Sequence, residues 1–176
     1  MKTFSLVILC SLLACKGAFG QATNSDYLDK VTTIDSTIET LYEVISGDAG
    51  EKRDWELFRY LFTEDAKLIP VRQSQDEGTA AVYWTPEQYV ERAGPILEKD
   101  GFFEKEISNK VEQYGSIAHT FSTYESYRKS TDSEPFTRGI NSIQLMHDGD
   151  RWWVVNIYWL GETDDNPIPD RYLPEG

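Results

Sequence analysis

The chain has 176 residues, of which 40 % are hydrophobic and 13 % aromatic, so it is long and apolar enough for one domain with a sizeable core and is not intrinsically disordered. Its formal net charge of −13 argues against nucleic acid and anionic membrane surfaces as partners. Both cysteines, Cys10 and Cys15, lie near the start, so a chain cleaved behind them has no thiol for disulfides, nucleophilic catalysis or zinc binding.

Residues 1–20 have the pattern of a secretory signal peptide. Lys2 precedes an apolar run over 4–14 that is too short to span a bilayer, and Ala18 and Gly20 place small residues at positions −3 and −1 of a cleavage site. Cleavage there removes two lysines and leaves 15 basic against 30 acidic residues, a net charge of −15. We therefore expect an exported protein, periplasmic or secreted.

A second processing route stays open, because residues 12–15, LLAC, resemble a bacterial lipobox. Cys15 would then be the lipidated first residue and would anchor the domain to a membrane that the chain does not span. The mature chain begins at Gln21 in one interpretation and at Cys15 in the other.

Residues 21–25 are interpreted as a flexible lead, and three helices are expected after them. Apolar residues spaced by three and four positions predict the first two helices, and a threonine cap followed by Pro86 predicts the third. The expected ranges are 26–46, 52–62 and 86–99. A short strand over 66–71 and a polar loop or loose hairpin over 72–80 separate the second helix from the third.

Four long strands with short connections follow, which predicts an antiparallel meander. Their expected ranges are 102–114, 116–129, 136–148 and 151–162. Three prolines in residues 163–176 predict an extended C-terminal tail. The segregation of helices from strands indicates one α+β domain over 26–162, with a curved antiparallel sheet wrapped around three N-terminal helices.

This order of elements, with the phrases LFTEDA at 61–66 and DGDRWWVV at 148–155, resembles the nuclear transport factor 2-like, or SnoaL-like, superfamily. The resemblance covers roughly residues 31–160. It implies a cone-shaped half-barrel with a pocket between sheet and helices, often dimeric through the outer sheet face. Members include isomerases, dehydratases, cyclases and non-catalytic binders, so the fold does not specify the chemistry. Pro70 stands where the steroid isomerases of the superfamily carry their catalytic aspartate.

Alternation along the last strand predicts two faces. The face that the resemblance places inward holds Trp153, Val155, Ile157 and Trp159. The opposite face holds Trp152, Val154, Asn156 and Tyr158. Because this second face is also largely apolar, it predicts a homodimer interface.

On the neighbouring strands, we expect the faces that carry His119, Glu125 and Asn141 to point inward. An inward His119 would serve as general base with Glu125, in a lyase or isomerase of the dehydratase or cyclase kind. The alternative, which we favour, is a core histidine and a solvated glutamate in a non-catalytic domain that binds a small apolar molecule or a protein partner.

The residues expected around such a ligand are Trp55, Phe121, Thr123, Asn141, Trp153 and Trp159. We predict no cofactor and no metal site, because neither of the two histidines belongs to a cluster with ligand spacing.

Overall fold

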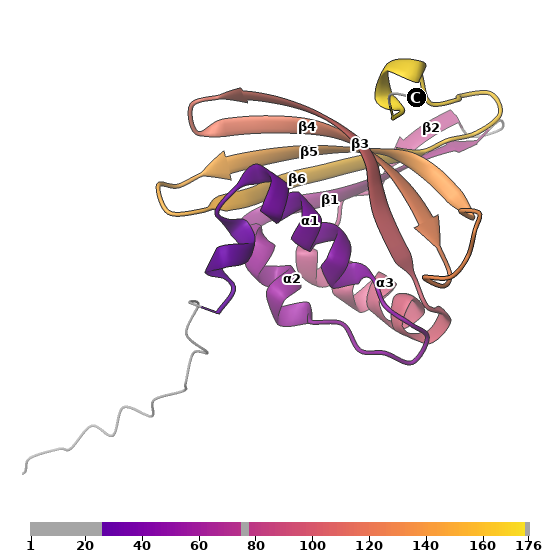
Figure 1. The fold of residues 1–176 in the computed structure, drawn as a ribbon, viewed down its shortest axis with the longest axis horizontal. Coiled ribbons are helices and arrows are strands. Elements are labelled where there is room, and N and C mark those ends of the chain that lie inside the picture. The colour runs from indigo at the N-terminus through magenta and orange to yellow at the C-terminus, as the bar shows by residue number, and fades with distance from the viewer. Residues whose placement is uncertain (1–25, 75–77, 175–176) are drawn as a thin grey trace, which may run out of the picture.

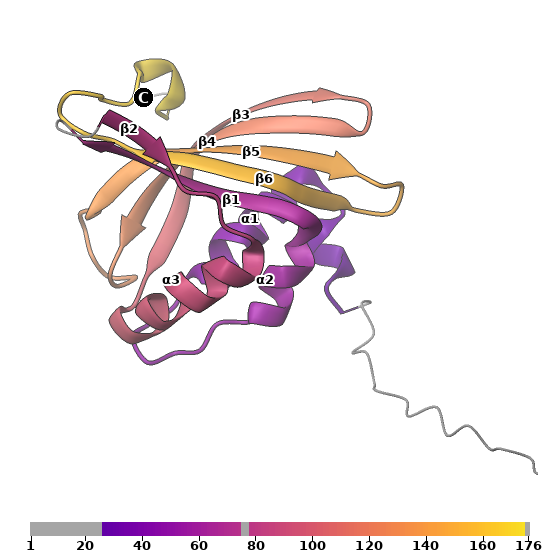
Figure 2. The ribbon, with the colours of Figure 1, turned by 180° about the vertical axis from the view of Figure 1, so that it is seen from behind.

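The computed structural model describes residues 26–74 and 78–174. The predicted signal peptide, Cys15 and the lead over 21–25 lie outside the described residues. In the described part, three α-helices cover the concave face of one curved sheet, and the C-terminal segment lies on the other side of that sheet (Figures 1 and 2).

The helices begin at polar caps. The predicted first helix is divided into a 3₁₀ turn, Leu28–Val31, and α1, Ile34–Ile45, because Thr33 is extended and its side chain accepts a hydrogen bond from the Ser36 amide. Helix α2 covers Trp55–Leu61. Helix α3 covers Pro86–Asp100, begins with the predicted Thr85 cap, and continues through Pro95.

The sheet has six strands in the order β2-β1-β6-β5-β4-β3. Their bounds are Phe62–Ser74 (β1), Gly78–Ala81 (β2), Phe103–Tyr114 (β3), Ile117–Tyr127 (β4), Thr137–His147 (β5) and Trp152–Gly161 (β6). Strands β3 to β6 form the predicted meander, and β1 with β2 forms a hairpin. The α+β prediction is confirmed, but the sheet is mixed and not antiparallel throughout as expected, because β1 pairs with β6 in parallel.

Strand β6 contains a β-bulge at Val155. Leu145 of β5 pairs with Val154, and Gln144 pairs with Asn156, which leaves Val155 as an extra residue without a partner. An extra residue reverses the in-and-out alternation beyond it.

The bulge corrects the predicted faces of β6. Trp152 and Val154 point to the core, where they are 6 % and 0 % exposed, although they were expected on the outer face. Beyond the bulge, Ile157 and Trp159 point inward as predicted. The expectation that Trp153 faces the interior is wrong. Its neighbours Trp152 and Val154 point to the core, so the Trp153 side chain points to the opposite side of the strand.

The C-terminal segment is not the extended tail that its prolines predict. It folds back against the convex face of the sheet, where Ile168 is buried and a 3₁₀ turn covers Asp170–Tyr172. The Tyr172 ring packs on Phe121 with centroids 5.4 Å apart, and the Thr123 hydroxyl donates to the Tyr172 carbonyl at 2.6 Å. Apolar side chains of the segment thus pack against the sheet and leave water. The three prolines alone do not indicate this packing.

Candidate ligand-binding site

A cavity of about 210 Å³ lies between the helices and the concave face of the sheet. All three α-helices and five of the strands contribute to its wall, and most of the contributed side chains are apolar or aromatic. The lining consists of Leu41, Tyr42, Ile45, Phe58, Leu68, Tyr89, Leu97, Phe102, Glu104, Tyr124, Asn141, Ile157 and Trp159. An apolar cavity of about 150 Å³ is enough to bind benzene, so this inner cavity has room for one ring with a short substituent.

One corner of the inner cavity is polar and hydrogen-bonded. The Ser126 hydroxyl donates to one carboxylate oxygen of Glu104 at 3.0 Å, and the Asn141 amide donates to the other at 3.3 Å. The same amide donates to the Tyr42 hydroxyl at 3.1 Å, and that hydroxyl is 2.6 Å from the Ser122 hydroxyl. The network joins α1 to three strands and holds Glu104 at a defined position in an otherwise apolar wall.

Glu104 is the group of this wall that titrates near neutral pH. Burial raises its pKa to about 7, although the hydrogen bonds from Ser126 and Asn141 act in the opposite direction. Burial also raises the pKa of Tyr42, Tyr89 and Tyr124, and the nearby Glu104 raises all three further, so these hydroxyls stay neutral. The wall therefore offers one ionisable carboxyl among neutral hydrogen-bonding groups.

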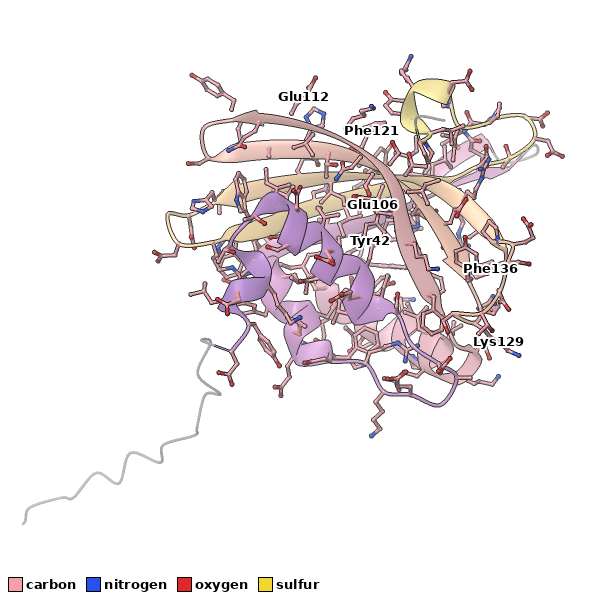
Figure 3. The ribbon with its side chains drawn as sticks, in the orientation of Figure 1. Tyr42, Glu106, Glu112, Phe121, Lys129 and Phe136 are labelled. Atoms are coloured by element: carbon pink, nitrogen blue, oxygen red, sulfur yellow. The ribbon has the colours of Figure 1, made fainter. Side chains whose placement is uncertain are left out.

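A second hollow, of about 520 Å³, lies between α1 and β3 and shares Tyr42 and Glu104 with the inner cavity. We name it the acidic groove, because its lining includes Asp35, Glu39, Glu43, Glu104 and Glu106. Tyr42 and Glu106 mark its place between helix and strand in Figure 3. Glu104 thus stands where the groove meets the cavity.

Two predicted ligand-binding residues, Asn141 and Trp159, line the inner cavity. Trp55 stands behind the wall instead. Its ring packs edge-on against Phe58, with centroids 5.6 Å apart, and its Nε1 donates to Glu98 at 2.8 Å.

The predicted pair of His119 and Glu125 does not form a site. The buried, inward side chains of β4 are those of alternate residues from Ala118 to Ser126, so His119 and Glu125 lie on the convex face. The His119 side chain is 45 % exposed, with Nε2 at 3.7 Å from a carboxylate oxygen of Glu112. Glu125 accepts a hydrogen bond from the Tyr127 hydroxyl at 2.6 Å.

Phe121, Thr123 and Trp153 also lie outside the cavity. Phe121 and Thr123 are covered by the C-terminal segment, and Figure 3 shows Phe121 and Glu112 on the side of the sheet away from the helices. The Trp153 ring lies 3.8 Å from the Arg151 guanidinium, and its Nε1 donates to Asp148 at 2.6 Å. These three residues stabilise the scaffold.

Glu104 is not among the predicted site residues, because a strand with the charged run Glu104, Lys105 and Glu106 has the pattern of a solvent-exposed strand. The next strand carries a signal that indicates this carboxyl, because Ser122 and Ser126 lie on the same face of that strand. Small hydroxyl residues on an inward face can serve as hydrogen-bonding partners for a carboxyl on the neighbouring strand.

Over residues 26–74 and 78–174, no group of three or more His, Cys, Asp or Glu side chains is arranged to hold a metal ion. Within the same residues, none of the helices has the length and hydrophobicity needed to cross a membrane.

No protein-family model matches the chain. No curated protein is significantly similar to it in sequence. Solved structures, in contrast, share its fold over most of their length.

A nuclear transport factor 2-like protein of unknown function from Silicibacter pomeroyi DSS-3 aligns with a TM-score of 0.51 at 13 % identity, over 80 % of this chain and 99 % of its own. A protein of the same superfamily from Salmonella enterica serovar Typhimurium aligns with a TM-score of 0.53 at 15 % identity, over 83 % and 94 %. LinA aligns with a TM-score of 0.54 at 10 % identity, over 81 % and 92 %. At such identities the likeness concerns the fold, and the chain has the cone-shaped α+β fold of the nuclear transport factor 2-like superfamily.

Proposed function

We propose that this chain binds a small, largely apolar molecule in the inner cavity. The observation that carries the proposal is an apolar hollow of about 210 Å³ with one fixed hydrogen-bonding corner at Glu104 and Asn141. Ligand sites are typically concave, mostly apolar and equipped with a few placed polar groups that orient the ligand. The size of the cavity favours ligands with a single ring.

The proposal is tested by filling the cavity. Leu97 lines it from α3, whereas its neighbour Ile96 is 56 % exposed, so Leu97→Phe and Ile96→Phe form a matched pair. Benzyl alcohol serves as a neutral probe, and its binding is measured by NMR titration of the purified protein. We expect wild type and Ile96→Phe to bind it, and Leu97→Phe to lose most of the affinity. Equal affinity in the two variants, or no binding to wild type, would refute the proposal.

A second candidate function is proton transfer on a bound molecule, as in a lyase or isomerase. His119 cannot act on the cavity from the convex face, but the Glu104 carboxyl, with a pKa of about 7, suits a general acid or base at the cavity wall. The assay is exchange of the α-hydrogens of cyclohexanone in deuterated buffer. Catalysed exchange that Glu104→Gln abolishes would support this function, and exchange at the buffer rate with wild type would exclude it for this probe.

We also propose that the protein is exported, on the evidence of the signal-peptide pattern in residues 1–20. Mass spectrometry of the protein isolated from its host gives the mature N-terminus. Gln21 would indicate cleavage by signal peptidase, and a lipidated Cys15 would indicate an anchored lipoprotein. A chain that still begins at Met1 would refute export through this segment.

We also propose a homodimer whose interface lies on the convex face of the sheet. Trp152 and Val154, which were expected in that interface, belong to the core instead. The proposal is supported by exposed apolar side chains on the convex face: Ile117 at 61 %, Tyr158 at 47 %, Val155 at 38 % and Met146 at 37 %. Analytical ultracentrifugation of wild type and Ile117→Lys tests it. We expect a dimer for wild type and a monomer for the variant, and a wild-type monomer at all micromolar concentrations would contradict it.

A further inference from the structure

We propose that the ligand of the inner cavity is a small organic cation, whose ammonium group lies beside Glu104 and whose apolar body fills the cavity. This inference rests on the proposed function and adds the charge of the ligand. Three features of the described residues support it: the partners of Glu104, the aromatic lining, and the charges along the acidic groove.

The first feature is that the Glu104 carboxylate receives hydrogen bonds only from neutral groups in the described part of the chain, Ser126 and Asn141. The residues that line the inner cavity include no lysine, arginine or histidine. Glu104 is half-buried, and a carboxylate that is largely withdrawn from water is stabilised by a paired cation, which no lining residue supplies. A ligand ammonium would complete the pair.

The second feature is the aromatic lining, which contains Tyr42, Phe58, Tyr89, Phe102, Tyr124 and Trp159. Phe58 and Tyr89 are stacked, with ring centroids 5.2 Å apart. The face of an aromatic ring carries negative charge density and attracts an organic cation, so these rings can accept both the apolar body and the charge of such a ligand. They offer no comparable attraction to an anion.

The third feature is the acidic groove that leads to Glu104. Asp35, Glu39 and Glu43 line it from α1, and Glu106 lines it from β3. Desolvation raises the pKa of Glu106 and the Asp35 carboxylate adds to that shift, while hydrogen bonds from Ser122 and Asn109 act in the opposite direction.

Little positive charge offsets these carboxylates. Glu43 has a lysine nitrogen at 4.0 Å, and Lys105, which also lines the groove, places its ammonium 5.1 Å from the centre of the Tyr127 ring. A cleft with charge of one sign concentrates ions of the opposite sign and speeds their association. The groove therefore favours the entry of a cation to the site where Glu104 stands.

The proposal predicts a pH dependence. The other titratable groups that line the cavity are Tyr42 on α1, Tyr89 on α3 and Tyr124 on β4, which stay neutral, while Glu106 and Lys105 flank Glu104 along β3. An ammonium requires ionised Glu104, whose pKa is about 7. Its affinity should therefore rise about tenfold from pH 6 to pH 8 by linkage, and the affinity of a neutral ligand should not rise.

Benzylamine and benzyl alcohol are probes of nearly equal size that differ in charge at neutral pH. Their affinities are measured by NMR titration on the full-length wild type, on Glu104→Gln, and on Glu112→Gln, a control on the convex face that is 80 % exposed. At pH 8 we expect wild type and Glu112→Gln to bind benzylamine at least about tenfold more tightly than benzyl alcohol. Glu104→Gln should lose that preference and still bind the alcohol.

Binding of benzyl alcohol as tight as that of benzylamine, or a preference that survives in Glu104→Gln, would overturn the cation proposal and leave the proposed function intact. Failure of both probes to bind wild type would overturn both. The comparison of pH 6 with pH 8 requires only the wild-type protein, so the proposal stays testable if Glu104→Gln does not fold, and an amine affinity that is constant over this range would also refute it.

Discussion

Glu104 should make the folded protein less stable as the pH rises toward neutrality. Burial raises its pKa in the folded state from 4.5 to about 7, whereas in the unfolded chain the carboxyl is solvated. Between these values the folded state holds a proton that the unfolded state has released. The contribution of Glu104 to stability is therefore most favourable at or below pH 4.5. It decreases as the pH rises to about 7 and stays low at higher pH.

The size of the effect follows from the two pKa values. A pKa raised from 4.5 to about 7 corresponds, at about 1.4 kcal/mol per pH unit, to about 3 kcal/mol of lost stability above pH 7. Glu104→Gln keeps the shape of the side chain and removes the charge. The variant should match wild type near pH 4.5 and exceed its free energy of unfolding by about 2–3 kcal/mol at pH 8, less any loss from imperfect hydrogen bonds of the new amide.

The assay is urea unfolding of wild type, Glu104→Gln and Glu112→Gln at pH 5 and pH 8, followed by tryptophan fluorescence. Glu112 lies on the convex face and is 80 % exposed, so its substitution should give nearly the same difference at both pH values. A Glu104→Gln variant that is no more stable relative to wild type at pH 8 than at pH 5 would contradict this prediction, because the carboxyl would then bear no cost of ionisation in the fold.

Three further changes test the scaffold. Arg53 donates to the backbone carbonyls of four residues and is 7 % exposed, so Arg53→Met should lower the free energy of unfolding by at least about 3 kcal/mol in chemical denaturation. Gly139→Ala would place a Cβ 2.5 Å from both the Leu160 carbonyl oxygen and the Tyr124 hydroxyl oxygen, so thermal unfolding should show clear destabilisation; an unchanged midpoint would contradict the close packing. Hydrogen bonds from the Asp150 amide, the Trp153 indole and the Arg151 amide lower the pKa of Asp148 from 3.8 to about 2. Asp148→Asn should therefore cost up to about 1 kcal/mol above pH 4, after allowance for solvent screening, and the difference from wild type should disappear as the pH falls to 2.

The sequence was informative about the fold wherever one face of an element is apolar and its ends carry specific residues. Thr85, Pro86 and Gln88 mark the start of α3, and the short connections predict the meander from β3 to β6. The parallel pairing of β1 with β6 could not be predicted from alternation, because it joins segments about 90 residues apart in the chain and depends on how the meander closes over the helices.

The site was only partly predictable, because alternation groups residues by face without saying which face is buried. On β4 the outward set contains Ile117 and Phe121, which resemble core residues more than the inward serines and threonines do, so His119 was placed on the wrong side. The inner face of β4 is polar because its hydroxyl groups donate hydrogen bonds to Glu104 on the neighbouring strand, as the Ser126 hydroxyl does.

The extra residue in β6 also has a consequence for the shape of the site. Trp152 and Trp159 are seven positions apart, an odd number, yet both point to the concave side because Val155 and Asn156 take consecutive outward places. A strand without Val155 would keep both tryptophans inward, at an even spacing of six, but it would lose the local bend and added twist that a bulge produces. The surplus residue thus adds to the curvature of this part of the wall without changing which side chains of β6 line it.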